Sequence, residues 1–114
     1  MPRSPSGALG QLELTILLAV ARLDADAHGL AIRRDISART KHDYSVGAVY
    51  TTLQRLENKG LLSSFTSDPL PVRGGRSRRH FQLTTAGRRA IRDAERRAAS
   101  LWAGIGRTLH PERA

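Results

Sequence analysis

The stretch SVGAVYTTLQRLENKGLL at residues 45–62 decides the fold of this 114-residue chain. Ser45 stands just before a periodic apolar run, where its hydroxyl can accept the amide protons of a first helical turn. Gly60 stands at the other end, and glycine is the residue expected in the left-handed conformation that ends a helix. The stretch therefore predicts a helix over residues 46–59.

The predicted helix has two different faces. At about 100° per residue, Val49, Leu53 and Leu56 fall within about 60° of one another and form an apolar stripe. The opposite face carries short or hydrogen-bonding side chains, whereas an ordinary solvated face would be richer in glutamate and lysine. A plain surface helix is the alternative interpretation, and the segment that follows favours a binding face instead. The side chains opposite the stripe are Gly47, Thr51, Gln54, Arg55 and Asn58.

A basic hairpin is predicted directly after this helix. Residues 61–67 begin apolar and include Phe65, and residues 76–83 alternate apolar with polar side chains, so both segments are typical of strands. Between them, two prolines and a Gly-Gly pair favour an irregular tip. Four arginines with no acid among them repel one another, which favours a surface for phosphate groups over a merely solvated charge run. They are Arg73, Arg76, Arg78 and Arg79, and Gly74 and Gly75 beside them would let the backbone approach DNA.

Two further helices are predicted upstream. Apolar residues recur at three- and four-residue steps over residues 8–23, and a shorter apolar pattern covers residues 30–40. Residues 1–7 hold two prolines, two serines and a glycine, so we expect them to form a frayed leader. The helices and the hairpin together predict one domain over residues 8–85.

A long helix is predicted over residues 86–110, after a threonine cap. Its apolar stripe is longer than its own domain can cover, so we expect it to pair with a second copy of the chain, together with the first helix. Packing within one chain is the alternative. Gly104 and Gly106 weaken the helix by about 1 kcal/mol each relative to alanine, so its last turns should fray before a tail at residues 111–114. The expected dimer interface consists of Leu9, Leu12, Ile16, Ile91, Ala94, Ala98, Leu101, Trp102 and Ile105.

Composition narrows the choice of partner and compartment. Nineteen lysine and arginine residues against ten acidic residues leave a formal charge of +9, which favours nucleic acid first and an anionic membrane surface second. The absence of cysteine excludes disulfides, iron–sulfur clusters and thiolate zinc sites, and it fits a reducing compartment. The longest apolar run, residues 14–21, is too short to span a bilayer and lacks the flanks of a secretory signal, so we expect a cytoplasmic location.

The order of three helices, a strand, a basic loop, a strand and a long helix predicts a winged helix–turn–helix with an appended dimerisation helix. This is a mainly α fold with a small β-hairpin (α+β). Over roughly residues 8–100 the chain resembles the PadR family of regulators. The resemblance is carried by LGQLELTILL at 9–18, HGLAIR at 28–33, the stretch at 45–62 and GGRSRRHFQLTTAG at 74–87.

The resemblance implies a dimeric repressor whose third helix enters the major groove and whose wing follows the adjacent backbone or minor groove. Two departures stand out. Thr51 occupies the position after the tyrosine where many relatives carry proline. The C-terminal region keeps only one helix, as in short-tailed members, so no separate effector domain is expected.

The DNA contacts that the resemblance implies can be assigned to residues of this chain by the chemistry of their side chains. Thr51, Gln54 and Arg55 are expected to reach base edges, since threonine can touch a thymine methyl, glutamine suits adenine and arginine suits guanine. Salt-sensitive affinity is expected from the wing, where Arg73, Gly75, Arg76, Arg78 and Arg79 would meet DNA. Contacts with backbone phosphates, which set the register, are expected from Lys41, Ser45, Tyr50, Thr52 and Lys59.

Other functions are weaker alternatives. The histidines, at positions 28, 42, 80 and 110, are scattered without metal-ligand spacing, so we expect neither an enzyme nor a metal or cofactor site. A basic module that binds RNA or a protein without regulating a promoter is the main rival to a DNA-binding regulator. Trp102 lies near the predicted helix–helix seam, where core packing competes with contact to a small planar ligand.

Overall fold

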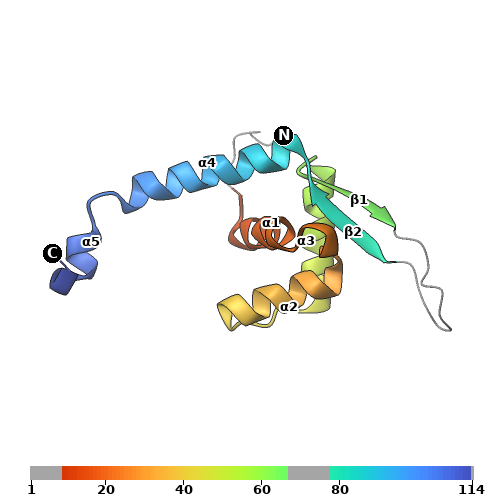
Figure 1. The fold of residues 1–114 in the computed structure, drawn as a ribbon, viewed down its shortest axis with the longest axis horizontal. Helices are drawn as coiled ribbons and strands as arrows, with labels where there is room; N and C mark the ends of the chain where they lie inside the picture. Colours follow the sequence, from red (N-terminus) through yellow and green to blue (C-terminus); the bar gives the residue numbers. More distant parts are fainter. Residues whose placement is uncertain (1–8, 67–77, 114) are drawn as a thin grey trace.

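The protein is seen in a computed structural model that describes residues 9–66 and 78–113 (Figure 1). Three helices form a compact group, an antiparallel hairpin lies against them, and a longer helix leads away toward the C-terminus. No helix in these two segments is long and apolar enough to cross a membrane. The elements are α1 (Gln11–Leu23), η1 (Asp24–Asp26, a short 3₁₀ helix), α2 (Gly29–Thr40), α3 (Val46–Asn58), β1 (Leu62–Thr66), β2 (Arg79–Leu83), α4 (Thr85–Trp102), α5 (Gly106–Leu109) and η2 (Pro111–Arg113, also 3₁₀).

The core lies where α1, α2 and α3 meet beneath the hairpin. The stripe predicted on the third helix is confirmed, because Val49, Leu53 and Leu56 are all buried. Full burial of an aliphatic side chain of this size contributes about 1.5–3 kcal/mol, so this stripe holds α3 firmly in the domain and leaves its other face outward. The remaining large core side chains are Ile16, Leu17, Val20, Ile32, Ile36, Leu62 and Phe81.

The helix ends follow the local signals in the sequence. The Ser45 hydroxyl accepts the amide proton of Ala48 at 3.0 Å, which confirms the predicted cap of α3. Gly60 takes a φ of +78° just after that helix, a conformation that glycine adopts without steric cost. Of the two threonines before the last helix, Thr84 is the cap, and its hydroxyl accepts the amide proton of Gly87 at 2.9 Å.

The hairpin is tied to the start of α2. β1 and β2 pair antiparallel, with Ser64 opposite Phe81. The Phe81 amide donates to the Ala27 carbonyl at 2.8 Å, and His28 forms an isolated β-bridge with His80. The hairpin is therefore joined to the domain beside the residue that precedes α2.

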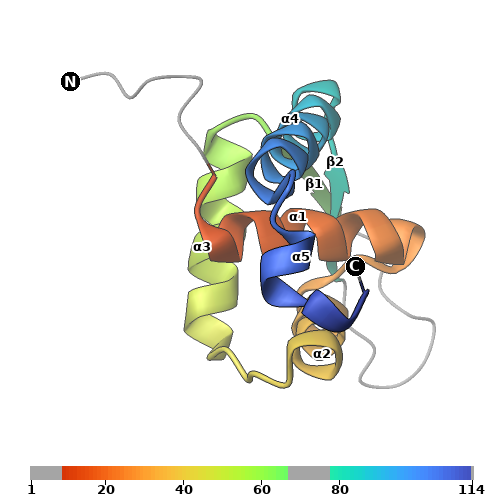
Figure 2. The same cartoon turned by 90° about the vertical axis from the view of Figure 1, so that its left-hand side faces the viewer.

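The predicted continuous helix over residues 86–110 is wrong at its end. α4 stops at Trp102, and α5 begins only at Gly106, because Ala103 with a ψ of 129° and Gly104 with a φ of +80° both leave the helical conformation. Figure 2 looks along α4, and in both views α2 lies on the side of the domain away from this helix. The C-terminal region is thus a helix, a break and one further helical turn.

The residues predicted for the dimer interface divide into two groups. Ile16 has no exposed surface, so it belongs to the core of its own chain and needs correction as an interface residue. Leu9, Leu12 and Ile91 are partly buried against the same core. The others lie farther along the C-terminal region: Ala94 is half-buried, Ala98 is exposed, Leu101 is 76% exposed, Trp102 is 61% exposed, and Ile105 is also exposed.

Candidate nucleic-acid interface

The outer face of α3 brings together four of the residues that the sequence assigned to DNA. One shallow depression is lined by Tyr50, Thr51, Gln54 and Arg55 together with Asn58, which the helical periodicity predicts on this face but which no predicted DNA contact includes. The Gln54 side-chain amide donates to the Asn58 side-chain oxygen at 3.0 Å. Their four-residue spacing is the signal that could have indicated this pair, because such residues are neighbours on a helix surface.

Tyr50 connects this face to the first turn of α2. A Cβ atom placed on Gly29 would lie only 2.0 Å from the Tyr50 hydroxyl oxygen, so the phenol occupies space that only glycine leaves open. Nearly half of the Tyr50 side chain remains exposed. Its hydroxyl therefore stands where α2 begins, at the border of the α3 face.

Residues around the start of α3 and the turn before it differ in what they can offer DNA. Ser45 and Lys41 are exposed, and Lys41 ends α2 with a left-handed φ of +60°. Thr52 is only 4% exposed, and its hydroxyl donates to the Ala48 carbonyl at 2.8 Å. The predicted phosphate contact of the Thr52 side chain is corrected, because that hydroxyl lies inside the domain.

Lys59 is held by an acid on another helix. Its ammonium lies 2.8 Å from a Glu13 carboxylate oxygen, and the other oxygen of Glu13 accepts the Gly10 amide proton at 2.8 Å. Burial by itself raises the pKa of Glu13, but the hydrogen bonds from Lys59 and Gly10 and the charges of Lys59 and Arg55 hold that pKa below its ordinary value. Lys59 thus joins the end of α3 to the start of α1. The sequence had instead predicted that Lys59 would contact a backbone phosphate.

The wing arginines are also divided. Arg79 forms an ion pair with Glu57 of α3, and its Nε donates to the Ser64 hydroxyl at 3.1 Å. Arg79 therefore fixes the hairpin to α3 instead of projecting alone. Arg78, by contrast, is directed toward the start of α2, where its guanidinium lies 3.0 Å from His28 Nε2. The other predicted wing residues, Arg73, Gly74, Gly75 and Arg76, lie outside the described residues, as does the predicted leader at 1–7.

A helix anchored by a buried stripe, presenting a polar outer face and flanked by a basic hairpin, defines the winged helix–turn–helix class of DNA-binding protein. The comparisons with known proteins then give the family. Residues 17–93 match the family described as the Transcriptional regulator PadR-like family, and the chain belongs to it. The resemblance inferred from the sequence motifs is thereby confirmed.

Relatives and solved structures agree with this assignment. The chain is 40% identical over 75 residues to Transcriptional regulator Rv3488 of Mycobacterium tuberculosis (strain ATCC 25618 / H37Rv), a match that spans 64% of each protein. A PadR family transcriptional regulator from Eggerthella lenta DSM 2243 superposes with a TM-score of 0.64 at 27% identity, over 86% of this chain and 87% of that one. A PadR-like transcription factor from Bacteroides fragilis gives a TM-score of 0.67 at 26% identity, over 81% and 84%. The predicted winged-helix fold is confirmed.

Proposed function

We propose that the chain is a dimeric transcriptional repressor that binds duplex DNA sequence-specifically, with α3 in the major groove and the wing on the backbone or minor groove. The observation that carries this proposal is the outer face of α3, where hydrogen-bonding side chains stand exposed on a helix whose opposite side is buried. An α-helix with its side chains is about 10–12 Å wide, and the major groove is about 12 Å wide. Because promoters lie on the chromosome, we propose the cytoplasm as the location.

Gln54 and Arg55 are the proposed readers of base edges. Gln54 gives one amide proton to Asn58, which leaves its second amide proton and its carbonyl oxygen for a further partner. Adenine offers one acceptor and one donor in that arrangement, so Asn58 would orient Gln54 for a bidentate contact. Arg55 would recognise guanine through its O6 and N7 acceptors. Each such contact is worth about 1–3 kcal/mol of discrimination.

The dimer is proposed to form through the C-terminal region. Leu101 and Trp102 are more than half exposed at the end of α4, and a second copy would cover them. Two-fold symmetry would then place two α3 helices on an inverted repeat. A small planar ligand between the two Trp102 rings is a second hypothesis, favoured by the exposure of this indole, and quenching of its fluorescence by planar compounds would test it.

Selection of duplexes from random DNA tests the proposal most fully, because it reports both the half-site sequence and the spacing. We expect an inverted repeat with half-site centres about one helical turn, or a multiple, apart. Gln54→Ala should relax the preference at one position of each half-site. Gln11→Ala, which removes an exposed glutamine at the start of α1, is the matched control and should leave the preference intact. Enrichment of no sequence, or tighter binding to structured RNA, would contradict the proposal.

A further inference from the structure

One carboxylate joins α3 to both strands of the wing. Glu57, near the end of α3, accepts a hydrogen bond on one oxygen from the Ser64 hydroxyl of β1, at 2.7 Å, and forms an ion pair through its other oxygen with Arg79 of β2. The Nε of Arg79 also donates to the Ser64 hydroxyl at 3.1 Å. Each of the three side chains is therefore bonded to the other two, and this cluster is called the Glu57 triad below.

The hydrogen bonds of the triad form a closed set. The serine hydroxyl has one proton, which it gives to Glu57, and it accepts the Arg79 bond on an oxygen lone pair. The central carbon of the Arg79 guanidinium also lies 5.3 Å from the centre of the Phe81 ring, at a distance suited to a cation–π contact. Arg79 is thus held by three groups of its own chain, although 46% of its side chain is exposed.

The triad lies at the end of the hairpin that is away from α4. Arg79 is the first residue of β2 and pairs with Thr66, the last residue of β1, whereas the other end of the two strands leads into α4. On α3, Glu57 follows Gln54 by three positions, so the two side chains are neighbours on the helix surface. The wing is therefore fastened to α3 beside a residue that is proposed to read bases.

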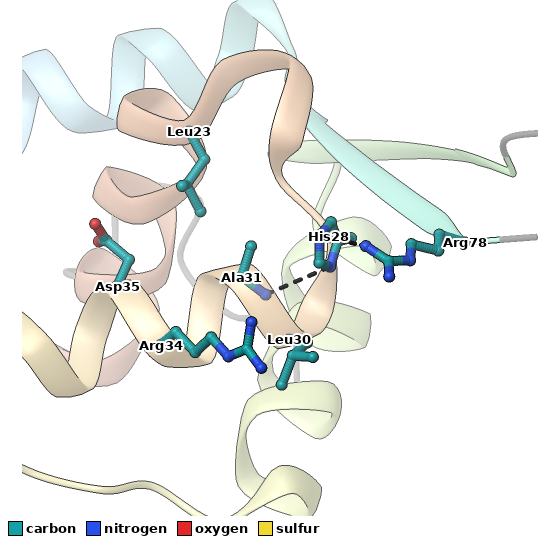
Figure 3. A pocket seen from close by; sticks show the side chains of 7 residues that line it. All are labelled: Leu23, His28, Leu30, Ala31, Arg34, Asp35 and Arg78. Carbon is teal, nitrogen blue, oxygen red and sulfur yellow. Dashed lines mark hydrogen bonds between the residues drawn. The ribbon is translucent and has the colours of Figure 1, made fainter.

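The arginine before Arg79 is engaged elsewhere in the chain. In Figure 3, Arg78 reaches across to the start of α2, where its guanidinium contacts His28. These two are the wing arginines within the part of the chain that the structure describes, and both have partners there. The formal charge of this part of the wing is therefore larger than the charge that it offers to phosphates.

Folding stability alone gives little reason for the Glu57 triad. An ion pair as exposed as this one contributes little to the free energy of folding, because water screens it and two long side chains have to be ordered. Its place beside the reading face matters more for binding. A cation that contacts phosphate raises the affinity for every sequence, whereas a regulator has to find its site among a large excess of other DNA. An arginine withheld from phosphates therefore favours discrimination.

We propose that Glu57 is a positioning residue that sets the DNA specificity of the regulator by holding Arg79 within the chain. Glu57 keeps the Arg79 guanidinium from the phosphates of arbitrary DNA. It also holds the wing in one position relative to α3, so that both elements meet the preferred site together. This inference rests on the proposed function, and it assigns a role to an acid for which the sequence analysis gave none.

The salt dependence of binding to a short labelled duplex of arbitrary sequence, measured by fluorescence anisotropy, tests whether Arg79 is withheld. Glu57→Gln keeps the size of the side chain but has one acceptor oxygen and no charge, so phosphate becomes the stronger partner for Arg79. We expect tighter binding, and a plot of log affinity against log salt that is steeper by about 0.9 for each arginine released. A roughly fourfold rise in salt then weakens binding about 3.5-fold more, for each released arginine, than it does in wild type.

Two controls separate the release of Arg79 from the simple loss of a negative charge. Asp93→Asn removes the acid that pairs with Arg96 on α4, and it should leave the salt dependence as in wild type. Glu57→Gln combined with Arg79→Gln should return to the wild-type slope, because the released guanidinium is then absent. A wild-type slope in Glu57→Gln, or a steep slope that persists in the double variant, would overturn the inference.

The ratio of affinities for the duplex obtained by selection and for a scrambled duplex tests the effect on specificity. In Glu57→Gln this ratio should fall several-fold, because scrambled DNA gains a phosphate contact whereas the selected site loses a wing held in place. An unchanged ratio, in a variant with the far-UV circular dichroism of wild type, would overturn the role in specificity and leave the proposed function standing. Failure of the wild-type chain to bind any duplex would overturn the proposed function itself.

Discussion

Gly87→Ala tests how α4 is joined to the winged domain. Gly87 lies in the first turn of α4, and an added Cβ would stand 2.1 Å from the carbonyl oxygen of Leu61 and 3.1 Å from its carbonyl carbon. That oxygen also accepts the Thr84 amide proton at 3.2 Å, so it cannot turn aside without breaking the link between β1 and α4. The backbone itself is the obstacle, and α4 must move.

The magnitude follows from two opposing effects. Carbon–oxygen contacts in proteins fall at about 3.3–3.6 Å, so the substitution requires a displacement of more than about 1 Å. Overpacking of this kind costs about 1–3 kcal/mol, and the upper end applies because no side chain can rotate away. Alanine returns up to about 1 kcal/mol through its higher helix propensity. We therefore expect a net loss of about 2 kcal/mol in the free energy of unfolding.

Urea unfolding followed by far-UV circular dichroism, at one fixed chain concentration, measures this loss. Gly47→Ala is the matched control, since a Cβ at Gly47 would meet no described atom within 4 Å. It should leave the protein as stable as wild type or more stable by up to about 1 kcal/mol. A Gly87→Ala protein as stable as Gly47→Ala would refute the close docking of α4 on the residues before β1.

Three further substitutions address DNA contact, assembly and pH. Gly29→Ala should turn the Tyr50 side chain aside and weaken duplex binding, measured by fluorescence anisotropy. The free energy of unfolding should change by less than about 1 kcal/mol, because the Tyr50 side chain can rotate into solvent. Normal affinity for the duplex would count against a role for Tyr50. Leu101→Asp should convert the dimer to a monomer in sedimentation velocity, and an unchanged dimer would place the interface elsewhere. The pKa of Glu13 in the folded protein lies below its ordinary value of 4.5. The bond between Glu13 and Lys59 therefore stabilises the fold above pH 4.5, and this stabilisation is lost as the pH falls through the pKa of Glu13 in the folded protein. Thermal unfolding of Glu13→Gln should therefore depend less on pH than wild type across that acidic window, and identical profiles would contradict the ion pair.

Local signals in the sequence were sufficient for most of the fold. The buried stripe of α3 and the cap at Ser45 depend on residues within a few positions of one another, and the structure confirms both. The alternation over β2 likewise places Phe81 in the core. Periodicity and capping are short-range effects, which is why they can be recognised without the rest of the chain.

Pairs that are distant in sequence could not be recognised in this way. Lys59 and Glu13 are 46 positions apart, and Arg79 and Glu57 are 22 apart. Their side chains meet only because α1, α3 and β2 pack together, so charge alone suggested that both cations were available to DNA. The same holds for His28, which seemed an ordinary residue until the fold placed Arg78 beside it.

The break at Gly104 shows the opposite case, a local signal that was outweighed. Glycine was recognised as weakening the helix, yet the apolar residues on both sides favoured continuity through residue 110. A left-handed φ costs glycine little, and here Gly104 takes it directly after Ala103 has left the helical conformation, so α4 ends at Trp102. The low helix propensity of glycine favours a break, whereas the apolar periodicity favours a continuous helix. Periodicity by itself does not show which of the two effects has the larger free energy.

Competition binding at physiological salt tests the central claim, that α3 reads duplex sequence. The duplex obtained by selection would compete against a scrambled duplex of the same length and composition and against a structured RNA. We predict that the selected duplex binds at least about a thousandfold more tightly than the scrambled one, the lower bound typical of specific regulators. Affinities for the three competitors that agree within a few-fold would mean that the chain responds only to phosphate charge, and would contradict sequence reading by Gln54 and Arg55.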